Sequence, residues 1–372
     1  MSSFRALGSR PCYREEADPS VSPGAPQGKA ILPAMKTVRH FRSADGRDLY
    51  GLPVEAFPGF SVNLYLILAG SSVLLVDCGT GLESCRRQIE ERFEEVRERF
   101  VPGLRISDVD LIVVTHGHID HFGGLPWLKE RTAAPATVHA LDRRVLSHYE
   151  ERVVVASKAL KGFLELAGVS PQRQARLMEM YLFAKGRYRS TPVEAVLKEG
   201  FPELEGLDGT VEVIHVPGHC PGQVCLRFGD VLLTADHVLA RTTPSQAPEA
   251  ITQNMGLGHF FESLEKISGV EGIRLALGGH EDPMDDLYGR VREIRSLHEE
   301  RLQKVVEICR EPRTVAEISL ELFGKRTSYH VLLALCEAGA HVEYLYQRGT
   351  LCATNVEEIE RLPNPVILYQ AC

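Results

Sequence analysis

The sequence predicts an α+β protein whose main part is a four-layer αββα sandwich, in which two mixed β-sheets pack together and helices cover both outer faces. Short runs rich in Val, Ile and Leu alternate with helical stretches along most of the 372 residues, a pattern typical of strands covered by other layers. Apolar side chains at positions 89, 93, 96 and 100 follow helical spacing in a segment otherwise rich in Glu and Arg, so this helix should cover one sheet. Phe228-Gly-Asp-Val231 predicts a tight antiparallel hairpin. Strands are expected at 62–68, 73–76, 111–115, 211–216, 224–228, 231–234 and 273–277.

The chain is expected to divide into three parts. Residues 1–34 form a flexible tail rich in Pro, Gly and Ser, and residues 35–290 form the sandwich domain. Within that domain, residues 142–199 have a helical pattern between two strand-rich halves, which predicts an inserted helical lid. Residues 291–372 form a small C-terminal domain.

The C-terminal domain shows the element order of a winged-helix module. After a helix that runs to Cys309, helices are expected at 314–323 and 328–338, and a strand pair at 341–346 and 350–353. A winged helix that reads DNA needs basic and polar side chains on its recognition helix, but 328–338 is mostly apolar. We therefore expect this domain to serve packing, homodimerisation or closure of a pocket.

Composition excludes several classes of protein. Apolar residues make up 44% of the chain and charged residues 25%, which excludes collagen-like, coiled-coil and wholly disordered proteins. The net charge of -8 argues against a dedicated nucleic-acid binder. No run approaches the roughly 18 apolar residues of a membrane span and no secretion signal is recognisable, so we expect a cytoplasmic protein without a membrane partner. The nine Cys include no CxxC pair, which predicts reduced thiols rather than disulfides or a cysteine-rich zinc site.

A dense cluster of His and Asp follows the strand expected at 111–115. The sequence His116-Gly-His-Ile-Asp-His121 places four candidate metal ligands within six residues. In an extended segment residues i and i+2 project the same way, so His116 and His118 can bind one ion while Asp120 and His121 face a second. Imidazole and carboxylate ligands suit zinc and also admit iron or manganese.

Three further candidate ligands follow later strands. His219 lies in a Pro/Gly turn, Asp236 follows the strand at 231–234, and His280 follows the strand at 273–277. One rim of a sandwich can bring such strand ends together. We therefore expect two divalent ions: one on His116, His118 and His219, and one on Asp120, His121 and His280, with Asp236 bridging them.

The order of these residues resembles the metallo-β-lactamase superfamily, and in particular its glyoxalase II-like branch, over about residues 49–287. Asp77-Cys-Gly79 is similar to the Asp-x-Gly turn of that family, which implies that Asp77 supports a ligand histidine. The C-terminal part resembles that of the β-lactamase-like protein 2 group, whose members are associated with endoribonuclease activity. The nucleic-acid-clamping domain of the superfamily's nucleases and the glutathione-binding tail of glyoxalase II are not recognisable.

The ligand set and the resemblance imply a hydrolase in which a metal-bridging hydroxide cleaves a small-molecule thioester, ester or lactone. Asp120 is the expected catalytic residue, because it can orient the nucleophile or move its proton. The lid carries eleven Lys or Arg against seven Asp or Glu, which favours an anionic or acyl-bearing substrate. Its apolar residues fit packing on the core, with an acyl pocket as the alternative. Candidate substrate-binding residues are His259, Lys185, Arg187 and Tyr188.

Three other functions remain open from the sequence. A metal-dependent endoribonuclease would account for the C-terminal domain, although the acidic chain and its apolar helix make a nucleic-acid partner the weaker prediction. An iron-dependent persulfide dioxygenase would use a similar ligand set with one iron. A winged-helix regulator would use the metal domain as a sensor.

Overall fold

The computed structural model describes residues 37–70, 72–202 and 211–372, so the tail expected at 1–34 lies outside the described residues. Its larger sheet follows chain order from β1 to β7. The first four strands pair antiparallel and the last four, β4 to β7, pair parallel. The strands are β1 (Arg39–Arg42), β2 (Asp48–Phe57), β3 (Phe60–Ala69), β4 (Ser72–Val76), β5 (Leu111–Val113), β6 (Ala136–His139) and β7 (Ala195–Leu197).

The second sheet has the strand order β11-β10-β9-β8. Its hairpin pairs Val231 with Phe228, as the intervening Gly-Asp sequence predicts, and β10 pairs parallel with β11. Gly229 in this turn has a φ of 57°, a conformation that glycine adopts at little cost. The strands are β8 (Glu212–His215), β9 (Val224–Phe228), β10 (Val231–Ala235) and β11 (Leu275–Gly278).

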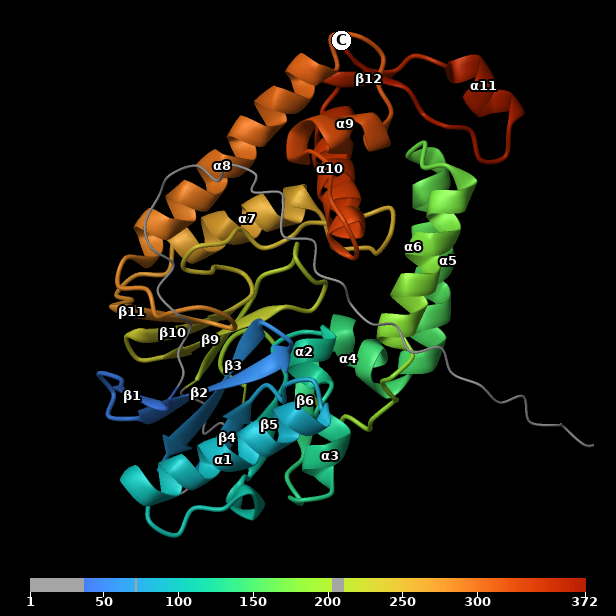
Figure 1. The fold of residues 1–372 in the computed structure, drawn as a ribbon. Helices are drawn as coiled ribbons and strands as arrows, with labels where there is room; N and C mark the ends of the chain where they lie inside the picture. The colour runs from blue at the N-terminus through green and yellow to red at the C-terminus, as the bar shows by residue number, and fades with distance from the viewer. Residues whose placement is uncertain (1–36, 71, 203–210) are drawn as a thin grey trace, which may run out of the picture. The chain divides into compact units, whose positions relative to one another are not determined.

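The two sheets pack face to face, and alternate residues of each strand face opposite layers. In β9, Val224 and Leu226 lie in the core between the sheets, whereas Cys225 faces the helices on the other side, as the two-residue strand period requires. Helix α1 (Glu83–Arg99) buries Ile89, Phe93 and Val96 on the larger sheet. Figure 1 shows α7 (Leu257–Ser268) and α8 (Leu287–Ile308) on the opposite side, over the smaller sheet. The predicted αββα sandwich is confirmed.

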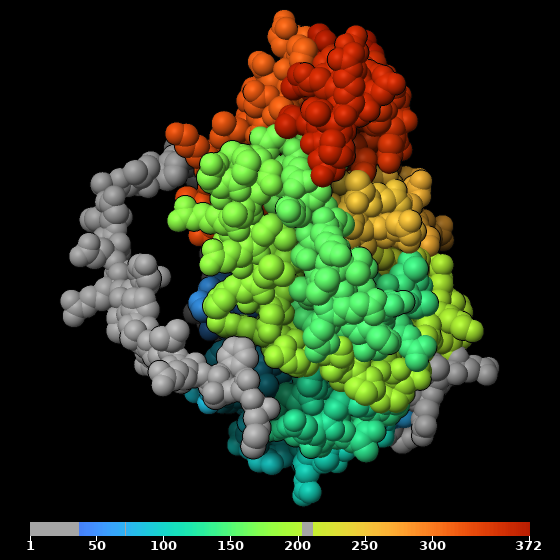
Figure 2. Space-filling view, turned by 90° about the vertical axis from the view of Figure 1, so that its right-hand side faces the viewer, coloured from blue at the N-terminus to red at the C-terminus, as the bar shows by residue number. Residues whose placement is uncertain are grey.

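The segment expected as a lid is mostly helical. It contains α4 (Ala140–Ser147), the long antiparallel pair α5 (Tyr149–Leu166) and α6 (Pro171–Lys185), and the short strand β7. Ala316 N and Ile367 N donate hydrogen bonds to Ala167 O and Leu166 O, 2.9 and 3.0 Å away. The tip of the α5–α6 pair is therefore hydrogen-bonded to the C-terminal residues. Figure 2 shows this meeting near the top of the molecule, where the green helices touch the red C-terminal part.

The winged-helix element order expected for the C-terminal residues is not confirmed. Residues 341–346 are not a strand but the second half of a single helix, α10 (His330–Gln347), which follows α9 (Val315–Phe323). The partner of β12 (Leu351–Ala353) is β13 (Tyr369–Ala371), reached through α11 (Val356–Arg361). His341, Val342 and Leu345 are buried, so tertiary packing favours helical over alternating spacing here. The boundary expected at 290 lies inside α8.

The expectation that the thiols are reduced is wrong at two positions. Cys352, the middle residue of β12, forms a disulfide with Cys372, and their Cα atoms are 5.8 Å apart. Six other cysteines among the described residues are free, and five of these are buried. None of the described helices has both the length and the apolar content needed to cross a membrane.

Candidate metal centre

The predicted ligands lie at one rim of the sandwich because each follows the carboxyl end of a strand or the turn after it. β5 leads into His116 and His118, and the four-residue helix α2 (Ile119–Phe122) then supplies Asp120 and His121. The turn after β8 carries His219, β10 leads into Asp236, and β11 leads into His280. The structure thus brings together all seven residues that the sequence predicts as ligands.

The seven side chains form the two expected triads around a shared carboxylate. The ligand atoms of His116, His118 and His219 lie within 4.8 Å of one another, and so do those of Asp120, His121 and His280. Asp236 lies between the triads: its Oδ2 is 3.7 Å from His219 Nε2 and 3.1 Å from His280 Nε2. This is the position required of a bridging ligand.

The outer nitrogens of four ligand rings are held by the surrounding protein. Nδ1 of His121 lies 2.8 Å from Asp77 Oδ2, and Nδ1 of His116 lies 3.1 Å from the Thr115 hydroxyl. Backbone carbonyls accept from the other two: Ser245 O is 2.8 Å from His219 Nδ1, and Ser61 O is 2.6 Å from His280 Nδ1. Such partners fix the ring orientation, so Nε2 of each ring faces the site.

Two buried carboxylates organise the turns that carry the ligands. Asp77 accepts from the backbone N–H and the hydroxyl of Thr115, at 2.8 and 2.9 Å, as well as facing His121. Asp142 accepts from Gly117 N at 2.8 Å and from Gly222 N at 3.0 Å, and the Cys220 thiol donates to it at 3.2 Å. Asp142 therefore joins the His116–His118 segment to the turn after His219.

The electrostatics of the site differ between its two histidine groups. Burial and the neighbouring His121 lower the pKa of His116 well below its usual value, which leaves that ring neutral. Burial acts the same way on the pKa of His118. Although burial alone raises the pKa of Asp236, His280 and His121 hold it well below its usual value. At the other triad burial lowers the pKa values of His121 and His280, but Asp236 outweighs it, so the pKa of His121 lies well above its usual value and that of His280 is also raised. The site therefore combines neutral rings at His116 and His118 with an ionised Asp236 that is paired with His121 and His280.

The residues present fit a pair of divalent cations. Within the described part of the chain, the buried atoms His121 Nε2 and Asp236 Oδ1 have no hydrogen-bond partner and lie 3.5 Å apart. Buried polar atoms are rarely left unpaired, and both belong to the candidate ligand set. A Cβ on Gly279 would lie 2.4 Å from Asp236 Oδ1, so glycine is required for the backbone to pass this close.

Of the residues expected to bind substrate, Lys185 and Tyr188 lie near the metal ligands. Burial lowers the pKa of Lys185, and the nearby Asp120 opposes this shift. Lys185 in turn adds to the effect of burial in lowering the pKa of His118. Tyr188 is 6% exposed and packs beneath the ligand segment, where a Cβ on Gly123 would meet its ring. Burial and the nearby Asp120 raise the pKa of Tyr188 to about 12.

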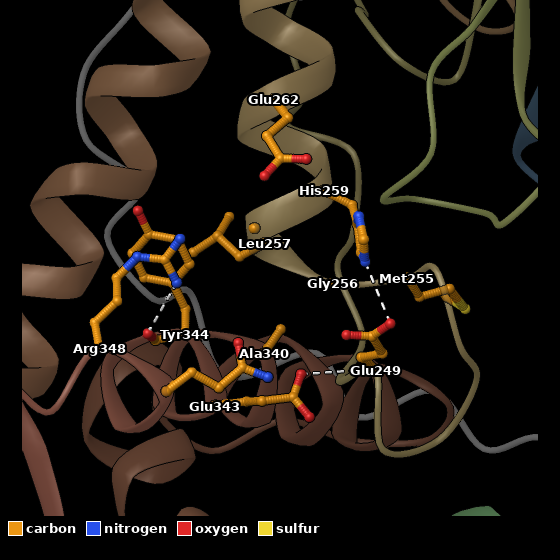
Figure 3. Close-up of a pocket in the computed structure, with 12 residues that line it drawn as sticks. Glu249, Met255, Gly256, Leu257, His259, Glu262, Ala340, Glu343, Tyr344 and Arg348 are labelled. Carbon is orange, nitrogen blue, oxygen red and sulfur yellow. Dashed lines mark hydrogen bonds and ion pairs between the residues drawn. The ribbon is translucent and has the colours of Figure 1, made fainter.

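Arg187 and His259 lie elsewhere. Arg187 is exposed and its guanidinium lies 4.8 Å from the centre of the Phe183 ring. His259 faces Glu249 at 3.2 Å in a cavity of about 210 Å³ between α7 and α10, which none of the seven predicted ligands lines. Figure 3 shows His259 and Glu249 pointing toward one another in this pocket, with Glu343 of α10 below them.

The sequence interpretation missed two groups that support the site. Asp142 counted only as the first residue of the lid, although its place just after β6 is the same kind of strand-end position as those of the ligands. The Ser245 carbonyl is a backbone group, which side-chain motifs do not reveal.

Comparisons with known proteins agree with this architecture. The profile of the metallo-beta-lactamase superfamily matches residues 57–307, and that of a metallo-beta-lactamase-like C-terminal domain matches residues 302–361. The lactamase-like protein aptB of Emericella nidulans is 24% identical over 281 residues, which cover 71% of this chain and 69% of that protein. An atrochrysone carboxyl ACP thioesterase of Aspergillus fumigatus is 22% identical over 262 residues, which cover 68% of this chain and 63% of that protein.

A solved structure extends the similarity to nearly the whole chain. The crystal structure of a metallo-beta-lactamase family protein from Thermus thermophilus superposes with a TM-score of 0.68 at 28% identity, and the match covers 87% of this chain and 98% of that one. The chain therefore belongs to the metallo-beta-lactamase superfamily and is one of its metal-dependent hydrolases.

Proposed function

We propose that this protein uses two divalent metal ions, with zinc the best fit to its ligands, to hydrolyse a small-molecule thioester, ester or lactone. The observation that carries this proposal is the pair of ligand triads that share Asp236. When bound, such ions would lower the pKa of water toward neutrality and polarise the carbonyl oxygen of the substrate. The resemblance to the glyoxalase II-like branch and the thioesterase among the relatives support a thioester or ester substrate.

Asp120 is the residue best placed to act on the nucleophile. Its side chain is 14% exposed, whereas that of His121 is fully buried, and its Oδ2 lies 3.5 Å from His280 Nε2. The Asp120 carboxylate therefore contacts the other candidate ligands and is also accessible from the open side of the site. In this position it can hold a proton from the attacking water and orient the remaining lone pair.

The position of Lys185 supports the proposal that the substrate carries an anionic group. Its ammonium lies near enough to Asp120 and His118 to interact electrostatically with both, and a desolvated ammonium binds carboxylates or phosphates through charge-assisted hydrogen bonds. The apolar residues of the lid support a packing role rather than an acyl pocket. Leu160, Leu164 and Leu177 are buried in the same core as α8 and α10.

The test begins with the metal content of purified protein, followed by hydrolysis assays on acyl-thioesters, lactones and single-stranded RNA. We expect about two zinc equivalents and turnover of at least one carboxylated thioester or ester. Asp120→Asn should lower that turnover at least about 100-fold, in line with a positioned acid–base group. The matched control is Asp110→Asn, because Asp110 is exposed and lies at the opposite end of β5.

Two results would overturn the proposal. One is unchanged turnover by Asp120→Asn, and the other is activity in protein from which all metal has been removed. RNA cleavage that falls steeply with added salt, in the absence of ester hydrolysis, would identify a nuclease instead.

A further inference from the structure

The C-terminal helix α10 binds a loop of the catalytic domain through two carboxylates. This loop runs from residue 242 to 256, between Asp236 and α7. Glu337 Oε2 accepts from Gln246 N at 2.7 Å. One and a half turns further along the helix, Glu343 accepts from Glu249 N and Ala250 N, at 2.7 and 3.0 Å. Three backbone N–H groups of the loop are thus bonded to side chains of one helix.

The same loop is bonded at two points to the turn that carries His219. The Ser245 carbonyl is 2.8 Å from His219 Nδ1, and Gly256 N donates to Gly218 O at 3.0 Å. Ser245 and Gln246 share a peptide bond, whose carbonyl faces the ligand ring and whose N–H faces Glu337. That peptide unit cannot rotate without breaking one of the two hydrogen bonds. Glu337 therefore sets the direction of the group that orients His219.

Glu337 is itself held firmly. It is 7% exposed, and Arg301 of α8 donates to its Oε1 at 2.9 Å while also donating to Thr243 Oγ1 at 3.2 Å. Helix and loop also meet closely at Gly339, where an added Cβ would lie 2.8 Å from Pro248 Cγ. A buried carboxylate with charged and backbone donors is a rigid anchor, because moving it leaves those donors unpaired.

We propose that Glu337 is a positioning residue of the metal centre, which acts through the Gln246–Ser245 peptide unit to hold His219 ready to bind its ion. The C-terminal module is then part of the support of the site and not only a covering domain. This inference rests on the proposed function, because it requires that His219 binds a metal ion.

A second interpretation of Glu337 is less well supported. Its Oε1 lies 3.7 Å from His298 Nδ1 and 4.0 Å from His341 Nδ1, so the three residues have the spacing of a metal site. However, both carboxylate oxygens already accept hydrogen bonds, from Arg301 and Gln246. His341 Nδ1 also faces the Glu337 carbonyl at 2.7 Å. The geometry therefore points to an anchor.

The experiment compares zinc affinities of the full-length protein, measured by competition with a chromophoric chelator at fixed pH. Glu337→Gln should weaken binding of one of the two zinc ions by about 10- to 100-fold, as for other groups that orient a ligand histidine. It should also change the absorption spectrum of the cobalt-substituted protein. The matched control is Glu343→Gln. It removes a carboxylate of the same helix that also accepts from the loop, but from Glu249 N and Ala250 N and not from the peptide unit of Ser245. Its zinc affinity should stay within about threefold of wild type.

A double-mutant cycle separates positioning from general destabilisation. If Glu337 acts through His219, then Glu337→Gln should have no further effect on zinc affinity in a His219→Ala background. An undiminished effect in that background would overturn the proposal, as would equal losses in Glu337→Gln and Glu343→Gln. Should Glu337→Gln fail to fold, Arg301→Met is used instead, both in the comparison with Glu343→Gln and in the double-mutant cycle. This variant removes the guanidinium that donates to Glu337 Oε1. Wild-type protein that binds no zinc would refute the proposed function, whereas unchanged affinity in Glu337→Gln would refute only this inference.

Discussion

Replacement of Asp142 by Asn should loosen the two ligand-bearing turns together. Asp142 is fully buried and its two oxygens accept from Gly117 N, Gly222 N and the Cys220 thiol. Asn has the same size but only one acceptor oxygen. Whichever way its amide turns, at least one buried backbone N–H then faces an NH₂ group instead of an acceptor.

The magnitude follows from the groups left unpaired. A buried donor without a partner costs about 1–3 kcal/mol, and the substitution creates at least two, the backbone N–H and the new amide N–H. One effect acts in the opposite direction: burial raises the pKa of Asp142, which shows that its ionised form is disfavoured in this environment, and Asn removes that cost. We therefore expect the free energy of unfolding to fall by about 2–4 kcal/mol.

Urea unfolding of metal-free protein at pH 8 measures this loss without a contribution from bound metal. The control is Asp110→Asn, because Asp110 is exposed and accepts a single hydrogen bond, from Val73 N at 2.8 Å, which Asn can also accept. It should stay within about 0.5 kcal/mol of wild type. An equally small change in Asp142→Asn would show that this carboxylate does not hold the turns.

Three further predictions concern acid stability, the disulfide and the lid. Burial and the neighbouring His341 lower the pKa of His298 to about 2, so the stabilising contribution of this residue is complete above the usual pKa near 6.5 and is lost as the pH falls. Its share of the free energy of unfolding should fall by about 2 kcal/mol from pH 7.5 to 5. In urea titrations, the decline over this range should be smaller by that amount in His298→Gln than in wild type, and parallel curves would contradict this. Cys352→Ser removes a disulfide between residues 20 apart in sequence, which should lower the free energy of unfolding by about 3 kcal/mol. Thermal unfolding should show the same loss for the wild-type protein in reductant, and an unchanged Tm in both samples would argue against the disulfide. Lys185→Met should raise KM for a carboxylated ester about 10-fold or more with zinc content unchanged, and an equal rise for a neutral ester would exclude anion binding by Lys185.

Local patterns were sufficient for much of the fold and for naming the candidate ligands that the structure brings together. The strands at 224–228 and 231–234 and the helix around Phe93 carry apolar periods that depend on neighbours in sequence, and the structure confirms them. The His116–His121 segment places four ligand side chains in six residues, so its chemistry is visible without a structure. Residues 341–346 show the limit of such patterns, because their side chains fit both alternating and helical spacing and only the packing of Val342 and Leu345 favours the helix.

The sequence alone therefore identified the candidate metal ligands and the strands that precede them, because both are encoded within a few neighbouring residues. Tertiary structure alone decided what holds those side chains in place. Asp142 bonds to Gly222 across 80 residues of chain, and Glu337 bonds to Gln246 across 91. Neither contact leaves a local signal, since a hydrogen bond to a backbone N–H depends on where two distant segments meet and not on the identity of the residue that donates.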